Sequence, residues 1–416
     1  MLKVILYAKM IPDSGVGGAE GAVVGLIQAL GKLPDEGEEY LIIAHRDHVD
    51  WLAPYLGPRQ RIVIEPDTRV RGWKKWIRLD RVVGEEFKRV LKRCLDLNTA
   101  FPTPKISCGF FESLGADVLH FPFQHFEISA LPSIFTPHDL QHRHYPNFFS
   151  PVNFARREVL YRAGCAYSQV VAVCGEWVKQ DVMQNYGTPP GKFAVIPWAP
   201  FTQTLTVPTE AELNSARKGH SLPAMFAFYP AMTWPHKNHL RLIEALHLLR
   251  ERHGLEVPLI CTGTKNAFWP RLEKRIKELK LEQQIRFLGL VSFKDLRAIY
   301  RLCRCVVVPS LFEAESGPVY EAWNDDLPVV CSNNTSFPGM VSDAALMFDP
   351  FSIDDMADKI RQIWENESLC RELREKGRRR LQDFSWEKTA RAYRALYRRL
   401  ANQPLDKEDR ARLENQ

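Results

Sequence analysis

Short apolar runs alternate with helical patterns along nearly the whole chain. Runs rich in β-branched and aromatic residues include "EEYLIIAHR" (38–46) in the first half and "VPLICTGT" (257–264) in the second. Between such runs lie segments such as "NHLRLIEALHLLRER" (238–252), whose leucines recur at helical spacing. Strands that are joined by helices and buried on both faces form parallel sheets. The alternation therefore predicts an α/β protein built from doubly wound parallel sheets.

The alternation occurs in two series, which a polar segment with several prolines (197–220) separates. A length of 416 residues also favours more than one domain. We predict a Rossmann-like domain over 1–200 and a second over 201–385, which face each other across a cleft. A helical tail over 386–416 is predicted to pack back towards the first domain.

Cysteine content and hydropathy exclude several classes of protein. The chain has nine cysteines without a C-x-x-C pair, and several lie inside apolar runs. This pattern is typical of reduced, buried thiols in a cytoplasmic protein, and it offers no zinc-type spacing. No apolar run reaches the roughly 18 residues that a membrane-spanning helix needs. The stretch "KVILYAKMI" (3–11) is predicted to be a first buried strand rather than a targeting segment.

Candidate ligand-binding residues follow the predicted strands, because open parallel sheets bind ligands beyond the carboxyl ends of their strands. Gly17 and Gly18 follow the first strand and open a helix, without the dinucleotide-binding glycine spacing. His138 follows a later strand of the same series. Lys237 and Asn238 precede a helix, where a cation opposes the helix dipole unless an anionic phosphate binds there.

The stretch "PSLFEAESGPVYEAW" (309–323) places two carboxylates on either side of a turn. Glu313 lies in a loop directly after a buried strand, and Pro318 suits the first turn of the following helix. Glu321 then lies about one turn into that helix. Ionised carboxylates bind hydroxyl groups strongly, so the two glutamates suit opposite ends of an elongated polar ligand such as a sugar nucleotide.

Five blocks of the sequence resemble, in the same order, the group 1 (family 4) retaining glycosyltransferases, which have the GT-B fold. The resemblance spans nearly the whole chain, is strongest from about 130 to 390, and does not specify the sugar. The blocks are "TPHDLQHRHYPNFFS" (136–150), "VVAVCGEWVKQDV" (170–182), "FYPAMTWPHKNHLRLIEAL" (228–246), "IRFLGLVSFKDLRAIYRLC" (285–303) and "PSLFEAESGPVYEA" (309–322).

The resemblance implies a role for each matching residue. Glu321 would bind the ribose of the nucleotide, and Glu313 would contact the transferred sugar. Backbone amides of Glu315, Ser316 and Gly317 would hold the hydroxyls of that sugar. These assignments place the nucleotide-sugar donor in the second domain.

Two further roles concern the diphosphate and the facing domain. Lys237 would neutralise the departing diphosphate, and Asn238 would belong to the donor-binding residues. His138, from the first domain, would contact the donor sugar near its reacting carbon. The loop at Gly17 and Gly18 would lie by the acceptor and the diphosphate.

The chain departs from the family pattern at three places, one of which is Gly339, where the family commonly has a glutamate. The usual E-G-F-G reads Glu313-Ala314-Glu315-Ser316 here, which removes two glycines and adds a carboxylate. The usual arginine five residues before the lysine is Met232, which removes one charge from the diphosphate site. His236 or Asn238 would have to compensate for it.

The resemblance implies an enzyme, a retaining hexosyltransferase or mannosyltransferase, that acts from a nucleotide-diphosphate sugar in surface polysaccharide synthesis. The chain has no D-x-D triplet, so we predict metal-independent transfer without a cofactor. A sugar-nucleotide epimerase and a non-catalytic sugar-nucleotide-binding subunit stay open as alternatives.

The expected partners are the nucleotide sugar and a glycan or lipid-linked acceptor, with no nucleic acid, since the net charge is only +6. The basic, tryptophan-containing stretch 69–93 suits either contact with an anionic membrane or a solvated helix. The expected location is the cytoplasm, with the inner face of the membrane left open.

Overall fold

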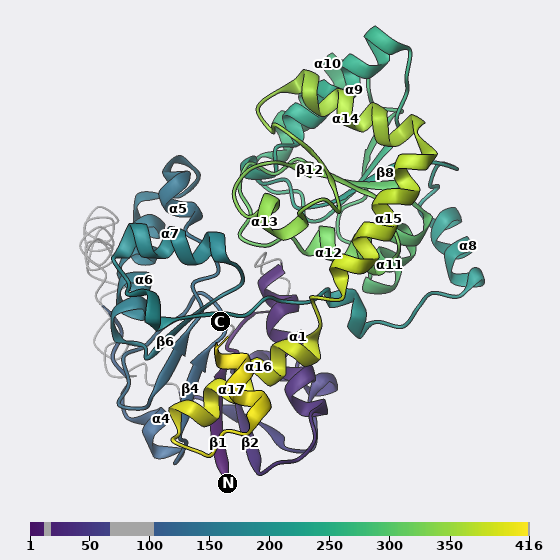
Figure 1. Cartoon of the computed structure of the whole chain (residues 1–416). Coiled ribbons are helices and arrows are strands. Elements are labelled where there is room, and N and C mark those ends of the chain that lie inside the picture. Colours follow the sequence, from purple (N-terminus) through teal and green to yellow (C-terminus); the bar gives the residue numbers. More distant parts are fainter. Residues whose placement is uncertain (12–17, 67–103, 415–416) are drawn as a thin grey trace, which may run out of the picture.

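The chain folds into two α/β units, each built around one parallel sheet (Figure 1). The computed structural model describes residues 1–11, 18–66 and 104–414. Gly17 and the basic stretch 69–93 therefore lie outside the described residues.

The first unit contains a seven-stranded sheet in the order β3-β2-β1-β4-β5-β6-β7. Every strand pair in it is parallel, as the alternation predicted. The strands are β1 (Leu2–Tyr7), β2 (Glu38–Ala44), β3 (Gln60–Ile64), β4 (Val118–Phe121), β5 (Ser133–Phe135), β6 (Val170–Val173) and β7 (Phe193–Val195). The helices described among them are α1 (Gly18–Lys32), α4 (Phe110–Ser113), α5 (Gln141–His144), α6 (Pro151–Tyr167) and α7 (Glu176–Tyr186).

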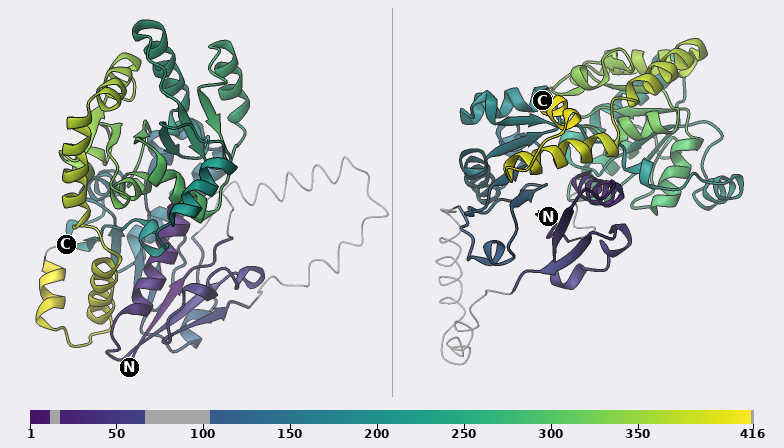
Figure 2. Two further views of the ribbon diagram at one scale, coloured as in Figure 1. Left: turned by 90° about the vertical axis from the view of Figure 1, so that its right-hand side faces the viewer. Right: turned by 60° about the horizontal axis from the view of Figure 1, so that its bottom comes forward.

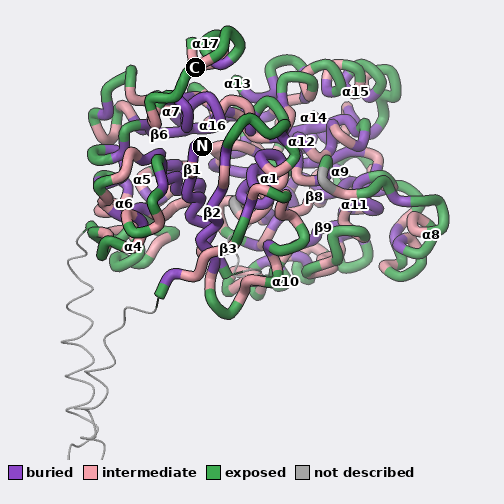
Figure 3. The backbone as a smooth tube through the Cα atoms, turned by 90° about the horizontal axis from the view of Figure 1, so that it is seen from below, coloured by how far each residue is buried: buried purple, intermediate pink, exposed green. Residues whose placement is uncertain are grey.

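The second unit contains a six-stranded sheet in the order β10-β9-β8-β11-β12-β13, again parallel throughout. The central strands of both sheets are buried, whereas the edge strands are only partly buried (Figure 3). The strands are β8 (Ala227–Pro230), β9 (Leu259–Thr262), β10 (Ile285–Phe287), β11 (Cys305–Val308), β12 (Val329–Ser332) and β13 (Leu346–Phe348). The helices are α9 (His239–His253), α10 (Trp269–Glu278), α11 (Phe293–Leu302), α12 (Gly317–Asn324), α13 (Phe337–Val341), α14 (Ile353–Glu365) and α15 (Glu367–Leu381).

Each sheet has one position where the strand order reverses. In the first sheet β1 lies between β2 and β4, and in the second sheet β8 lies between β9 and β11. Loops that leave neighbouring strands at such a point turn to opposite faces of the sheet and leave a crevice for a ligand. The loops after β8 and β11 are those that carry Lys237 and Glu313.

The segment between the two sheets is more ordered than the linker that the sequence suggested. It contains the helix α8 (Glu210–Gly219), which contacts α11 of the second unit. Thr209 and Glu212 form a capping box at the start of this helix, which satisfies backbone N–H groups there. The prolines therefore flank a helix instead of marking an irregular connection.

The C-terminal tail lies against the first unit, as both Figure 1 and Figure 2 show. Its helices are α16 (Trp386–Leu400) and α17 (Lys407–Glu414), and α16 contacts α1. The Trp386 ring packs where a side chain at Gly25 would collide with it, so this glycine allows the close approach. Arg398 pairs with Glu36 and with Asp409. Helix α16 therefore completes the core of the first unit. The exact limits of the domains stay predictions.

None of the helices that the structure describes is long and apolar enough to cross a membrane.

Candidate functional site

Lys237 and Glu313 meet at the reversal point of the second sheet. Lys237 ends a short 3₁₀ helix (Pro235–Lys237) after β8, and its Nζ lies 2.6 Å from Oε1 of Glu313. Their side chains keep 20% and 12% of their surface exposed, so the pair is sheltered but accessible. The hydroxyl of Tyr229 on β8 donates to the Lys237 carbonyl and also contacts the Ser310 hydroxyl. The sheet thus holds both loops in one arrangement.

Glu321 lies one turn into α12, as predicted, and α12 has a proline in its first turn. The hydroxyl of the buried Tyr300 on α11 donates to Oε2 of Glu321 at 2.6 Å. Burial raises the pKa of Glu321 to about 7, against the effect of that hydrogen bond, and the nearby Asp325 carboxylate raises it further. A carboxylate with such a pKa changes charge near neutral pH. Sequence analysis did not single out Tyr300, because an aromatic residue in a buried helix is normally core.

Asn238 braces the loops of the site from within. It adopts a left-handed backbone conformation, with φ of 58°, and its side-chain amide donates to the carbonyls of Pro309 and Pro350. Its Oδ1 accepts a hydrogen bond from Arg241. These hydrogen bonds engage both the amide nitrogen and the oxygen of the Asn238 side chain. A direct contact between Asn238 and the donor stays a prediction. Arg241 is a cation beside the site that sequence analysis did not identify.

The three residues after Ala314 have different surroundings. Glu315 points to the first unit, where its Oε1 accepts hydrogen bonds from the Trp198 backbone N–H and the Tyr320 hydroxyl. Burial raises the pKa of Glu315 to about 8. Ser316 is buried, and Gly317 is exposed at the start of α12. The roles predicted for their backbone amides stay predictions.

His138 lies in the first unit and has an unusual backbone conformation. Its φ of 64° lies in the left-handed region, which costs a residue with a Cβ some strain. Its Nε2 lies 3.0 Å from the carbonyl oxygen of Pro122. A carbonyl can only accept, so Nε2 carries the hydrogen and Nδ1 keeps its lone pair. Burial lowers the pKa of His138 to about 4, so the ring is neutral at physiological pH.

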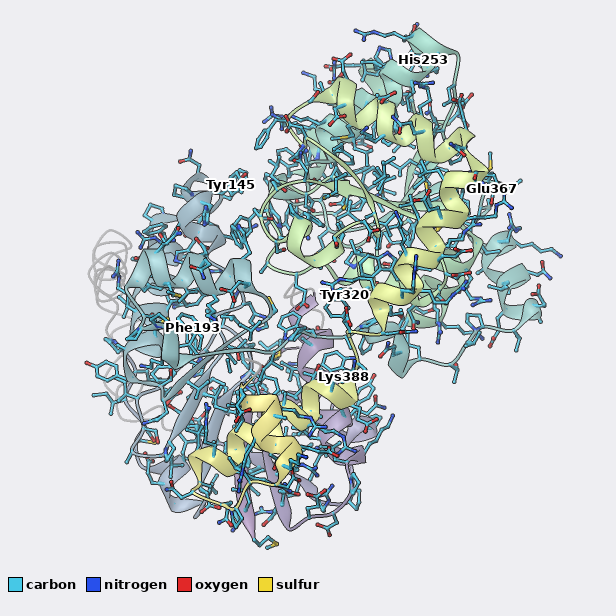
Figure 4. The ribbon with its side chains drawn as sticks, viewed as in Figure 1. Tyr145, Phe193, His253, Tyr320, Glu367 and Lys388 are labelled. Carbon is cyan, nitrogen blue, oxygen red and sulfur yellow. The ribbon has the colours of Figure 1, made fainter. Side chains whose placement is uncertain are left out.

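The two units touch beside these residues, and Figure 4 labels Tyr145 on the side of the first unit that faces the second. The hydroxyl of Tyr145, which follows α5, donates to the carbonyl of Leu311 at 3.1 Å. The ring of Phe312 packs against His144 and Trp177 of the first unit, with centroids 5.1 Å and 5.6 Å apart. Burial raises the pKa of Asp139, next to His138, and the Glu313 carboxylate adds to this effect. The loop of His138 therefore lies near the pair formed by Lys237 and Glu313.

Two other expectations concern the first glycine loop and metal ions. Gly18 is described as the exposed first residue of α1, with open space around it. Within the described ranges, no three His, Cys, Asp or Glu side chains are grouped to hold a metal ion. Independence from metal stays a prediction.

Comparisons with known proteins identify relatives among bacterial mannosyltransferases. The chain is 34% identical over 179 residues to the O-antigen chain mannosyltransferase B of Escherichia coli, which covers 41% of this chain and 46% of that one. It is 30% identical over 185 residues to the serotype-specific mannosyltransferase WbdA of Escherichia coli, covering 43% of this chain and 22% of that one. The matches thus span less than half of the length of these curated relatives.

Solved structures with the same fold match the chain over almost its full length. The sucrose-phosphate synthase of Thermosynechococcus elongatus superposes with a TM-score of 0.70 at 19% identity, over 96% of this chain and 99% of that one. WaaG, a glycosyltransferase involved in lipopolysaccharide biosynthesis, superposes with a TM-score of 0.64 at 12% identity, over 96% and 99%. At these identities the likeness shows the fold, which is GT-B.

Family models account for most of the chain in two adjoining pieces. The model described as Glycosyltransferase Family 4 matches residues 16–199, and the model described as Glycosyl transferases group 1 matches residues 213–380. The resemblance seen in the sequence is confirmed, and the chain belongs to the group 1, family 4 glycosyltransferases.

Proposed function

We propose that this protein transfers a hexose from a nucleotide-diphosphate sugar to a glycan or lipid-linked acceptor. The observation that carries the proposal is the convergence of Lys237 and Glu313 at the reversal point of the second sheet, with Glu321 on the following helix. This arrangement supplies a cation for a leaving diphosphate and two carboxylates for the hydroxyl groups of a sugar nucleotide. Membership of the family supports the transferase over the epimerase alternative.

In the proposed reaction, the bond between the sugar and the diphosphate breaks while charge builds on the departing oxygen. A fixed ammonium group stabilises such charge better in a sheltered site than in water. Lys237 would supply it, with the guanidinium of Arg241 as a second cation in place of the arginine that Met232 replaces. Glu313 would exchange its contact with Lys237 for the hydroxyls of the sugar.

His138 would face the sugar from the first unit as a neutral ring. Its Nδ1 is buried and has no hydrogen-bond partner among the described residues, since Nε2 donates to Pro122; it would accept a hydrogen bond from a sugar hydroxyl that reaches it. The low pKa of the buried ring argues against a role as a cationic acid. We assign His138 the task of orienting the donor.

The finer details are proposals as well. Retention of configuration follows from the resemblance, and metal-independent transfer follows from the lack of a D-x-D triplet and the presence of Lys237. Mannose is the sugar that we propose, since the relatives with the highest identity reported above are named mannosyltransferases. We also propose that the reaction serves the synthesis of O-antigen-type polysaccharide, as the name of one relative suggests, and that it takes place at the cytoplasmic side. No cofactor other than the donor is proposed.

A panel of nucleotide sugars, including GDP-mannose and UDP-glucose, tests the donor site by thermal shift and calorimetry. We expect one member to raise the melting temperature and to bind the wild type but not Glu321→Ala. Release of nucleoside diphosphate that depends on an added glycan acceptor would separate the transferase from an epimerase. A protein that binds none of the panel, or that binds equally well without Glu321, contradicts the proposal.

A further inference from the structure

Glu315 makes different contacts from the carboxylates of the proposed donor site. Glu313 pairs with Lys237, and Glu321 bonds to Tyr300. Glu315 instead bridges its own helix α12, through the Tyr320 hydroxyl at 2.8 Å, to the first unit, through the backbone N–H of Trp198 at 3.2 Å. It is therefore a buried carboxyl group that joins the two units.

Trp198 connects this bridge to His138. The two rings pack edge to face, with centroids 4.6 Å apart and an angle of 68° between their planes. The other side of the segment is fixed by the tail helix, since Thr389 donates to the carbonyl of Pro197 and Trp386 donates to that of Pro200. Trp198 thus lies between an anchored backbone and Glu315, with its ring against His138.

The position of His138 needs such support because its backbone is strained. A positive φ on a residue with a Cβ persists only when the surrounding contacts enforce it. The contacts on the ring are the Pro122 carbonyl on one side and Trp198 on another. Displacing Trp198 would free the ring to turn away from a substrate.

We propose that Glu315 is a positioning residue, which holds Trp198 through its backbone N–H and thereby fixes the His138 ring towards the sugar donor. The proposal rests on the proposed function for the role of His138, but the path from Glu315 to His138 is independent of it. Cys174, which follows β6, and Tyr393 of α16 lie near the carboxyl group of Glu315 without bringing a positive charge. Oε1 of Glu315 thus accepts hydrogen bonds from both the N–H of Trp198 and the O–H of Tyr320.

Three variants test the path. Glu315→Leu removes the acceptor from two sheltered donors, whereas Glu315→Gln keeps a carbonyl oxygen at Oε1 and should keep the hydrogen bonds from Trp198 and Tyr320. Asn324→Ala is the matched control, because Asn324 also links α12 to the segment after β7, through Thr202, without contact to Trp198.

The first readout is the imidazole NMR signal of His138, identified as the one that His138→Asn lacks. We expect Glu315→Leu to move it, and Glu315→Gln and Asn324→Ala to leave it in place. An unmoved signal in Glu315→Leu, or an equal shift in Asn324→Ala, overturns the proposal. This readout needs no substrate.

The second readout is the slow release of GDP from GDP-mannose in water, in which a water oxygen bonds to the sugar carbon and the diphosphate leaves. We expect Glu315→Leu to lower this rate about 10- to 100-fold, as expected for a misplaced contact at a reacting centre, with unchanged GDP-mannose affinity by calorimetry. Equal rates in Glu315→Leu and wild type contradict the inference. A wild type that binds no sugar nucleotide contradicts the proposed function, while the NMR result still decides the inference.

Discussion

The two units of the molecule obtain their order in different ways. The polar contacts of Lys237, Glu321 and Asn238 come from the second unit itself: Lys237 with Glu313, Tyr300 with Glu321, and Asn238 with two carbonyls. The first unit depends on parts far away in the sequence, since its core is completed by α16 and its segment after β7 is bound by Glu315.

This difference indicates which of the two units can hold a rigid sugar-nucleotide site. A donor-binding unit that braces Lys237, Glu321 and Asn238 from within can hold its ligand before the first unit takes part. The facing unit, with a strained His138 supported from several elements, can adjust when the units move relative to each other. Substitutions in each unit test whether the two units differ in this way.

The largest effect is expected from Trp386→Ala. Removing a buried tryptophan typically costs about 3–5 kcal/mol, and Trp386 packs on α1 and donates to the Pro200 carbonyl. Hydrogen exchange followed by mass spectrometry should show faster exchange in β1, β2 and α1 but not in the second sheet. Trp364→Ala, in the core of the second unit, should give the opposite distribution. Equal destabilisation of both units by Trp386→Ala would remove the contrast.

Lys237→Ala should abolish most of the turnover. Loss of one preorganised group that stabilises a leaving charge typically costs about 10²- to 10³-fold in kcat, and steady-state release of nucleoside diphosphate measures it. Lys274→Ala is the control, because Lys274 is a solvent-exposed lysine of the same unit. Circular dichroism should show an intact fold in both variants, and a turnover like that of the wild type in Lys237→Ala would refute its role.

Glu321 should make donor affinity depend on pH. Its pKa of about 7 means that the carboxyl is protonated below neutral pH and becomes a weaker acceptor for ribose hydroxyls. We therefore expect donor affinity to fall as the pH drops through about 7 and to level off above it. Glu321→Gln should lose roughly tenfold in affinity at pH 8 and lose the pH dependence. Calorimetry between pH 6 and 9 measures both, and a persistent pH dependence in this variant would assign it to another group.

The smallest effect is expected from Tyr300→Phe. It removes one hydrogen bond to Oε2 of Glu321, worth about 0.5–1.5 kcal/mol, so donor affinity should fall about two- to tenfold. Tyr320→Phe removes the hydrogen bond to Glu315 instead and should leave donor affinity unchanged. If both variants lower donor affinity equally, the contacts within the second unit are not enough to fix the donor site.

Much of the site was predictable because it depends on local patterns. The buried run before Pro309 predicted a strand, and the positions of Glu313 and Glu321 after it followed from the loop and helix signals. The strand β3 and the helix α6 were not predicted, since β3 is only partly buried and α6 lacks a strong apolar face. Asn238 lies at the start of a helix, as predicted, but its role as a brace depends on carbonyls far along the chain.

Two series of buried strands and helices could be read from the amino-acid sequence, together with the strand ends at which polar residues gather. This was possible because burial and helical spacing depend on residues that are close together in the sequence. Only the tertiary structure decided that Lys237 and Glu313, 76 positions apart, touch each other. It also decided that α16 fills the core of the first unit and that Glu315 faces Trp198. These contacts depend on the order of strands in the sheets and on the return of the tail, which are set by packing of the whole chain and leave no periodic signal in any one segment.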